Sequence, residues 1–540
     1  MVGLGAARGG AQTHHTRQKA CSGRAEHDAR KPKGVFIVRC AQLGMGAGLK
    51  SLSEFGRDEW VAREEKRRQD GASRGRLGLL RQAWQGVDSR LRWLAALLLA
   101  TLVPLLASNV YVVQVAGLTG LYVILALGLN VVAGLGGLLD LGYVAFYGVG
   151  AYLYALLASP QFGLHWPFLL ILPLAVAAVA LLGFLLGAPS LRLRGDYLAI
   201  VTLGFGQIAS LLFLNLDRVD LPFLGLAQPL NITGGPNGII NLDGVSLLGL
   251  TVRTPAGYYE LILFFVALVF LAVYHLDRSR IGRAWRAIRE DELAAQTMGV
   301  DVRRLKLLAF AVGGSIAGAA GVLFAAWQGS VFPPNFDVSV LIILYAMIVL
   351  GGVGSVSGAI SGAVILSILP EALRSPTLAR LLFYGALIGG LLYLYRKQWQ
   401  RGLLILGSVA ALGIVLKVLL GALEPAWFLH PQLAPSLADS ALAPFFSLIN
   451  AWLLFPRSSL AVGNVAFVLT VLAWLALARV KGRAREILLA PALYALIFVW
   501  ETRLLADPSV TRMLILGAVL VLMMNYRPQG LFGQKWVQRT

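Results

Sequence analysis

Long apolar runs, separated by short polar loops, recur along the chain from Trp93 almost to its end. Each run holds about 17 to 25 residues, the number that a helix needs to cross the hydrocarbon core of a bilayer. The run at residues 168–188 is apolar on every face, whereas an outer-membrane strand would alternate between apolar and polar positions. The pattern therefore predicts an all-α fold, a polytopic bundle of helices that lies within a membrane.

The apolar runs predict about fourteen membrane spans. They lie near residues 94–112, 117–135, 138–158, 168–187, 197–214, 259–276, 306–327, 338–352, 356–370, 381–395, 402–423, 460–478, 486–500 and 512–526. The apolar piece at 441–455 is short for a crossing and would break the even count. It is therefore predicted to be interfacial or re-entrant.

Basic residues in the loops orient these spans. Arg192, Arg194 and the basic residues of the stretch 278–306 fall on one side of the membrane. Because loops rich in Lys and Arg stay in the cytoplasm, that side is the inner one, and the polar loop 215–258 lies outside. The first long apolar run starts near residue 93, so no cleavable secretory signal is expected. The predicted location is a bacterial inner membrane, with the lipid bilayer around a multi-pass chain.

Composition supports a membrane protein. Hydrophobic residues make up 57% of the 540 residues and charged residues only 14%, which is too apolar for an ordinary soluble domain. The net charge of +20 lies mainly in the loops and in residues 1–90, so membrane topology explains it without a nucleic-acid partner. Residues 1–90 are predicted to form a basic, mostly disordered cytoplasmic arm. The alternative is a reading frame that begins later, at Met45 or beyond.

One charged stretch, which starts at Arg280, interrupts the apolar pattern. On a helix, Ile281, Trp285 and Ile288 would share an apolar face, and three arginines would share another face. The stretch therefore predicts an amphipathic helix at the cytoplasmic surface that another protein can dock on. The alternative is a solvated connector whose basic residues only fix the topology.

Seven stretches of the sequence together resemble a known family. They are "GLLDLGYVAFYGVGAYLYALL", "LRLRGDYLAIVTLGFGQI", "NITGGPNGI", "GRAWRAIREDELAAQTMGV", "KLLAFAVGGSIAGAAGVLFA", "VLGGVGSVSGA" and "NYRPQGLFG". In this order they resemble the LivM-type permease subunit of bacterial branched-chain amino acid ABC importers. The resemblance implies a partner set of a second, homologous permease, two cytoplasmic ATP-binding subunits and a periplasmic substrate-binding protein.

The resemblance also implies a role for the charged stretch. In the family, this loop is the coupling element, a short helix that sits in a groove of the ATPase. The coupling residues implied here are Arg283, Trp285, Arg286, Arg289, Glu290, Glu292, Ala294, Ala295 and Gly299. The general importer motif has Glu-Ala-Ala, three residues and then Gly. This chain departs from it, because Leu293 stands in the place of the Glu and the nearest acid is Glu292.

The resemblance divides the chain into four parts. Residues 1–90 precede it, and residues 91–380 form the permease core with its coupling loop at 278–306. Residues 381–510 are inserted and hold about four spans, whereas 511–540 hold the last core span and a cytoplasmic tail. About ten spans thus belong to the core. The insertion is predicted to be a packing module that faces lipid or a partner.

The chemistry of catalysis is not expected in this chain. It has no Gly-x-x-x-x-Gly-Lys-Ser/Thr motif, so ATP hydrolysis is assigned to separate subunits. The Gly-rich stretch 351–363 lacks that ending, and its Gly354 and Gly358 are predicted to pack helices closely. Two cysteines and six scattered histidines predict neither a disulfide framework nor a metal site. No catalytic residue and no cofactor are expected.

A zwitterion with an apolar tail needs polar groups along an apolar pathway. Asp140 is a candidate for lining it, although its alternative role is the N-cap of the following helix. Asn130 and Gln207 are further candidates, and hydrogen bonding between helices is their alternative. The outer turn "NITGGPNG" is either structural or a contact for the binding protein. Its candidate contact residues are Asn231, Gly234, Gly235 and Asn237.

The sequence thus favours a transmembrane permease subunit of an ABC importer that moves leucine, isoleucine or valine and is not itself an enzyme. A secondary transporter is one alternative, and it would need mid-span carboxylates and internal repeats. A membrane-embedded enzyme would need paired carboxylates or histidines near a membrane face. An ABC permease for urea or short amides is a third alternative. The sequence separates the substrates of these permeases poorly.

Overall fold

Helices make up almost all of the secondary structure in the computed structural model. It describes residues 97–532 apart from 107–108, 191–195, 220–230, 248–249, 397, 424–443, 445–446, 449–451, 454–458, 481–482, 507 and 528. The predicted arm at 1–90, Arg192, Arg194 and most of the predicted re-entrant piece therefore lie outside the described residues.

The described helices follow the predicted apolar runs. Those before the charged stretch are α6 (Val103–Leu106), α7 (Val110–Leu129), α8 (Tyr143–Leu157), α9 (Phe168–Ser190), α10 (Asp196–Asn215) and α11 (Pro255–Arg278). The next are α12 (Arg280–Glu290), α13 (Glu292–Thr297), α14 (Val302–Gln328), α15 (Val338–Gly351), α16 (Val356–Ala372) and α17 (Pro376–Leu394). The last are α18 (Trp399–Leu423), α21 (Ser459–Arg479), α22 (Arg483–Ala506) and α23 (Pro508–Tyr526).

Within the described part of the chain, seven helices are long and apolar enough to cross a membrane, and five further apolar helices are shorter. The predicted class, an all-α polytopic membrane bundle, is confirmed. One predicted boundary is wrong, because the break between the first two runs lies before Val110 and not between the predicted spans 94–112 and 117–135. Instead, α7 and the π-helical segment η1 (Asn130–Leu135) form one span, Val110–Leu135. Gly117 lies inside α7, where the side chains of Ile262 and Trp327 pack against it.

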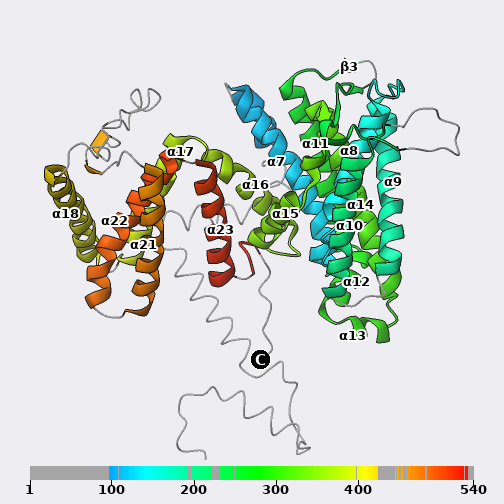
Figure 1. The fold of residues 1–540 in the computed structure, drawn as a ribbon. Coiled ribbons are helices and arrows are strands. Elements are labelled where there is room, and N and C mark those ends of the chain that lie inside the picture. Colours follow the sequence, from blue (N-terminus) through cyan, green and yellow to red (C-terminus); the bar gives the residue numbers. More distant parts are fainter. Residues whose placement is uncertain are drawn as a thin grey trace, which may run out of the picture. The chain divides into compact units, whose positions relative to one another are not determined.

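The bundle is built around α14, which packs against α7, α8 and α9 (Figure 1). Glycines permit these close contacts. A Cβ added at Gly313 would collide with Val132 of η1, and one added at Gly321 would collide with the backbone of Tyr147 in α8. On the other side, α7 packs against α11 and α16. The helices therefore approach at backbone distance, as small residues allow in a membrane bundle.

The predicted close packing of the Gly-rich stretch is confirmed for two helices, α15 and α16. A Cβ added at Gly358 would lie 2.7 Å from the Gly351 carbonyl oxygen, and one added at Gly362 would collide with the Met347 carbonyl oxygen. Gly354 has a different place from the one predicted. It lies in the turn between the two helices, at φ 83°, where a side chain would be strained.

Two short antiparallel sheets lie at the end of the bundle opposite α12 and α13 (Figure 1). The strands β1 (Ile239–Ile240) and β4 (Ser330–Val331) pair with Ile239 opposite Val331. The strands β2 (Ser246–Leu247) and β3 (Leu250–Thr251) form the second sheet. The loop after α10 is thereby fastened to the outer end of α14, as its hydrogen bond from Leu242 N to Gly329 O also shows.

The helices after the core have an apolar cluster of their own, drawn from α17, α18 and α22. A buried ion pair joins α17 to α22: the Arg380 Nη2 and Glu501 Oε2 atoms lie 2.6 Å apart, and Glu501 is fully buried. The Tyr384 hydroxyl donates to the other carboxylate oxygen at 3.0 Å. Beside them, the rings of Phe383 and Trp500 stack at 4.3 Å. Burying an unpaired charge costs folding free energy, and each residue of this pair reduces that cost for the other.

Candidate functional site

The charged stretch forms a hairpin of two short helices, α12 and α13, between the long helices α11 and α14. Side chains cap each joint. The Ser279 hydroxyl accepts from Gly282 N at 3.2 Å, the Asp291 carboxylate accepts from Leu293 N and Ala294 N at 3.0 Å, and Asp301 accepts from Arg304 N at 3.1 Å. Ser and Asp are preferred at these positions because their oxygens satisfy free helix-end N–H groups. The hairpin is therefore a defined element rather than a loose connector.

The predicted apolar face holds α12 against the bundle. Trp285 and Ile288 are buried, and Ile281 is partly buried. The Trp285 indole donates to the Leu305 carbonyl of α14 at 2.7 Å. Trp285 is thus enclosed by its own chain. Among the implied coupling residues, it anchors the hairpin to the bundle.

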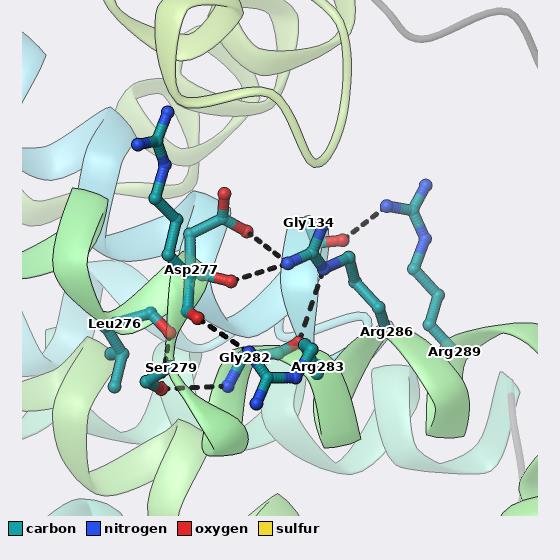
Figure 2. A network of polar contacts seen from close by, with 9 residues as sticks. Gly134, Leu276, Asp277, Ser279, Gly282, Arg283, Arg286 and Arg289 are labelled. Carbon is teal, nitrogen blue, oxygen red and sulfur yellow. Dashed lines mark hydrogen bonds and ion pairs between the residues drawn. The ribbon is translucent and has the colours of Figure 1, made fainter.

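Arg283, Arg286 and Arg289 lie on α12 at the predicted spacing, but their partners and exposure differ. Two of them are partly buried and donate hydrogen bonds to backbone carbonyl oxygens (Figure 2). Arg286 donates to the Asp277 carbonyl oxygen at 2.6 Å, whereas Arg289 donates to the carbonyl oxygen of Gly134 in η1. Only Arg283 is exposed, with a hydrogen bond to the Arg278 carbonyl at 3.0 Å. Carbonyl oxygens at the end of α11 and in η1 thus accept the hydrogen bonds of these guanidinium groups. Partial burial lowers the pKa of Arg289.

The exposed tip of the hairpin is partly apolar. Leu293 is 74% exposed and Met298 is 83% exposed. Between them, Ala294 faces out and Ala295 is buried. Large apolar side chains that are exposed at a surface favour a protein partner. The implied coupling residues included neither Leu293 nor Met298, although an apolar residue in the place of the family's Glu was the available signal.

The remaining implied coupling residues surround this tip. Glu290 and Glu292 are exposed, and the Glu292 carboxylate pairs with Lys306 Nζ at 2.8 Å. Gly299 has φ 82°, and no described atom lies within 4 Å of a Cβ added there. The positive φ explains the glycine, because it lets the chain turn sharply into α14.

Two of the pathway candidates lie inside the bundle near the hairpin. Asn130 is buried and its Oδ1 accepts at 2.9 Å from Gly354 N, so its hydrogen bond runs to the α15–α16 turn and not to another helix. Asp140 is 1% exposed, and its Oδ1 accepts from Gly142 N at 2.9 Å. The alternative role of Asp140 as N-cap is wrong, because α8 starts at Tyr143 and Gly142 is its N-cap. Gln207 is exposed on α10 and does not join them.

In the turn "NITGGPNG", the glycines have a structural role. Gly234 and Gly235 have φ values of 72° and 53°, and a Cβ added at Gly234 would collide with the Gly238 carbonyl oxygen. The Asn231 Oδ1 accepts from Gly234 N at 2.8 Å. Asn231 and Asn237 are exposed at the rim, and Asn237 belongs to the short segment η3 (Gly235–Asn237). The turn is thus rigid and presents two amide side chains outward.

A hairpin with capped joints on a multi-pass helical bundle defines the class of a polytopic membrane protein. The family described as "Branched-chain amino acid transport system / permease component" matches residues 111–396, and the chain belongs to this family. The predicted resemblance is confirmed. The family supports a transport permease rather than the secondary-transporter alternative.

Its relatives are transport permeases of two kinds. The chain is 41% identical over 335 residues to the high-affinity branched-chain amino acid transport system permease protein LivM of Escherichia coli (strain K12), a match that covers 58% of this chain and 75% of the relative. It is 30% identical over 197 residues to a probable LivM of Methanocaldococcus jannaschii, covering 36% and 53%. It is also 37% identical over 115 residues to LivH of Escherichia coli (strain K12), covering 21% and 36%. The two kinds indicate a permease pair. No solved structure matches the chain.

Proposed function

We propose that this chain is the permease subunit of an ABC importer that carries leucine, isoleucine or valine across a bacterial inner membrane. It pairs with a second, homologous permease, two cytoplasmic ATP-binding subunits and a periplasmic substrate-binding protein. ATP is hydrolysed by the separate subunits, and this chain makes and breaks no bond. The names of its LivM and LivH relatives support the substrate class and the pairing.

The observation that carries this proposal is the anchored hairpin with an apolar tip. Its base is fixed by the Trp285 indole and by three capped joints, while Leu293 and Met298 project from it. Burying one such side chain in a groove stabilises a complex by roughly 1.5 to 3 kcal/mol. The two side chains together suit a groove in the ATP-binding subunit, and the rigid base suits the transfer of force.

The translocation step is alternating access, in which the two permeases open first to the periplasm and then to the cytoplasm. The substrate carries two opposite charges and an apolar side chain, which backbone dipoles and apolar helix faces can accommodate. We place Asn130 and Asp140 at the cytoplasmic end of this route, because both are buried near the base of the hairpin. Asn231 and Asn237 are the proposed contacts of the binding protein.

Uptake of labelled leucine tests the function. Cells that hold the whole transporter should accumulate leucine, and deletion of either the binding protein or the ATP-binding subunits should abolish that uptake. Excess isoleucine or valine should compete, whereas excess urea or acetamide should not. Uptake that survives these deletions and follows the proton gradient would show a secondary transporter instead. Competition by urea or acetamide alone would assign the amide substrate.

A further inference from the structure

Four segments that are far apart in the sequence meet at the base of the coupling hairpin. They are the end of α12, the segment η1, the turn between α15 and α16, and the segment after α23. We call their contact the cytoplasmic junction, and it consists of Arg289, Asn130, Gly134, Gly137, Gly354, Leu531 and Phe532. Two of the family motifs in this sequence, "VLGGVGSVSGA" and "NYRPQGLFG", contribute residues to the junction.

Arg289 fits into the junction between glycines. Its Nη1 donates to the Gly134 carbonyl oxygen, 155 residues earlier in the chain. A Cβ added at Gly137 would lie 3.0 Å from the Arg289 Cγ atom, and one added at Gly354 would collide with Nη1. Gly137 and Gly354 have φ values of 68° and 83°. Both positions therefore favour glycine for two reasons. The backbone has a positive φ, and the Arg289 side chain occupies the space that a Cβ would need.

The π-helical segment η1 supplies the acceptors. A π-turn bonds each carbonyl one residue further along than an α-turn does, and such turns are frequent at functional sites. Here Asn130 Oδ1 accepts from Gly354 N at 2.9 Å, so η1 is bonded to the α15–α16 turn directly. A Cβ added at Gly134 would lie 2.8 Å from the same nitrogen. Any movement of Arg289 is thus passed to η1 and to this turn together.

The C-terminal segment closes the other side of the turn. Leu531 N donates to Leu350 O, and Phe532 N donates to Gly351 O, both at 2.9 Å. A Cβ added at Gly530 would lie 2.5 Å from the Gly352 Cα atom. The end of α15 is therefore held between η1 and the segment after α23.

The other anchors of the hairpin reach only to its neighbours in the sequence. Trp285 bonds to α14, which follows the hairpin, and Arg286 bonds to α11, which precedes it. Arg289 instead reaches η1, which continues α7, and lies beside Gly354 in the turn that joins α15 to α16. If the hairpin moves with an ATP-binding subunit, Arg289 is the side chain that transmits this displacement to the ends of α7, α15 and α16.

We propose that Arg289 is a positioning residue that couples movement of the hairpin to the cytoplasmic ends of α7, α15 and α16. Its link to Gly134 and Gly354 makes these ends open and close with the ATP-binding subunits. This inference rests on the proposed function. The charged fork of an arginine suits the role, because a guanidinium bonds carbonyl oxygens more strongly than a neutral donor does.

The test compares three versions of the whole transporter in proteoliposomes: wild type, Arg289→Ala and the control Arg303→Ala. Arg303 is an exposed residue in the first turn of α14, and its replacement removes the same charge from the same membrane face. Leucine uptake and ATP hydrolysis are measured in each. A cysteine at Ala294, in chains whose native cysteines are replaced, reports docking by crosslinking to the ATP-binding subunit.

With Arg289→Ala we expect uptake per ATP hydrolysed to fall about tenfold, while the crosslink from position 294 persists. Arg303→Ala should match wild type in both. A wild type that shows no ATP-dependent leucine uptake would contradict the proposed function itself. An unchanged uptake per ATP in Arg289→Ala would overturn the inference and leave the proposed function standing.

A second pair of variants approaches the contact from its glycine side. Gly354→Ala places a methyl group where Nη1 lies, and Gly163→Ala repeats the backbone strain at φ 63° with no described atom within 4 Å. We expect only Gly354→Ala to lower uptake per ATP. If Arg289→Ala and Gly354→Ala both lose assembly or the crosslink, the junction holds the fold instead of transmitting movement, and the inference is wrong.

Discussion

At the scale of single residues, the partners of a side chain decide its role, and those partners come from distant segments. The sequence identified Arg283, Arg286 and Arg289 as a group. The structure gives them different partners, because Arg286 donates to a carbonyl oxygen of α11 and Arg289 donates to one of η1. No spacing rule within α12 reveals a free carbonyl 155 residues away. Hydropathy and family resemblance located the hairpin, but they did not identify which of its side chains face out.

The apolar tip leads to a prediction for docking. Replacing both Leu293 and Met298 with alanine removes most of the apolar surface at the tip, so the affinity for the ATP-binding subunits should fall about tenfold or more. Leu271→Ala, on the exposed face of α11, is the control, since Leu271 is 53% exposed but lies within a span. Co-purification of the ATP-binding subunits with the chain measures the effect. Equal recovery from the double variant and the control would refute docking through the tip.

At the scale of elements, periodicity and length predicted the helices well, and glycine explains where they did not. The predicted break before residue 117 is absent because Gly117 packs against Ile262 within a continuous α7. Hydropathy cannot distinguish a glycine that ends a helix from one that lets a neighbour approach. The predicted spans near 338–352 and 356–370 left a break where the turn between α15 and α16 lies, but the small-residue spacing assigned Gly354 to helix packing. The π-helical segment η1 also gave no signal in the apolar pattern.

The buried ion pair between α17 and α22 gives a prediction for stability. Glu501→Gln leaves Arg380 without its counter-charge, which should cost about 3 to 5 kcal/mol of folding free energy. The triple variant Arg380→Met, Tyr384→Phe, Glu501→Leu removes every polar group of the cluster and should recover most of that loss.

Glu486→Gln is the matched control for that charge change. It breaks the exposed pair with Arg401, whose atoms lie 3.4 Å apart, and should cost about 1 kcal/mol or less. Thermal unfolding of the detergent-solubilised chain ranks the variants. A triple variant no more stable than Glu501→Gln would mean that the ion pair itself stabilises the contact between α17 and α22.

At the scale of the whole molecule, the described chain has two main apolar clusters. The larger one draws on α7 to α16, and the smaller one on α17, α18 and α22. The family match ends at residue 396, so α18, α21 and α22 lie beyond it. We propose that the inserted segment, 381–510, is a packing module outside the translocation route. The family resemblance predicted this insertion, and its even number of spans kept it compatible with the core topology, but neither revealed the buried Arg380–Glu501 pair that joins α17 to α22.

This division predicts that the transporter tolerates a shortened insertion. Replacing residues 398–482 with a short flexible linker removes α18 and α21, an even number of spans, and so keeps the direction of α22 and α23. Leucine uptake per assembled complex should stay within about twofold of wild type, because the larger cluster is untouched. Uptake measured beside the amount of chain in the membrane checks this. A complete loss of uptake at normal abundance would place the insertion within the transport machinery.

The Arg380–Glu501 pair also has a consequence for how the protein is made. The two residues are 121 positions apart, so the ribosome has still to synthesise most of the insertion when α17 reaches the translocon. An arginine inside a helix disfavours its release into lipid by up to about 3 kcal/mol. We therefore expect α17 to remain at the translocon, or near the interface, until α22 emerges and delivers the carboxylate. During biogenesis of this chain, α17 and α22 would then enter the bilayer together.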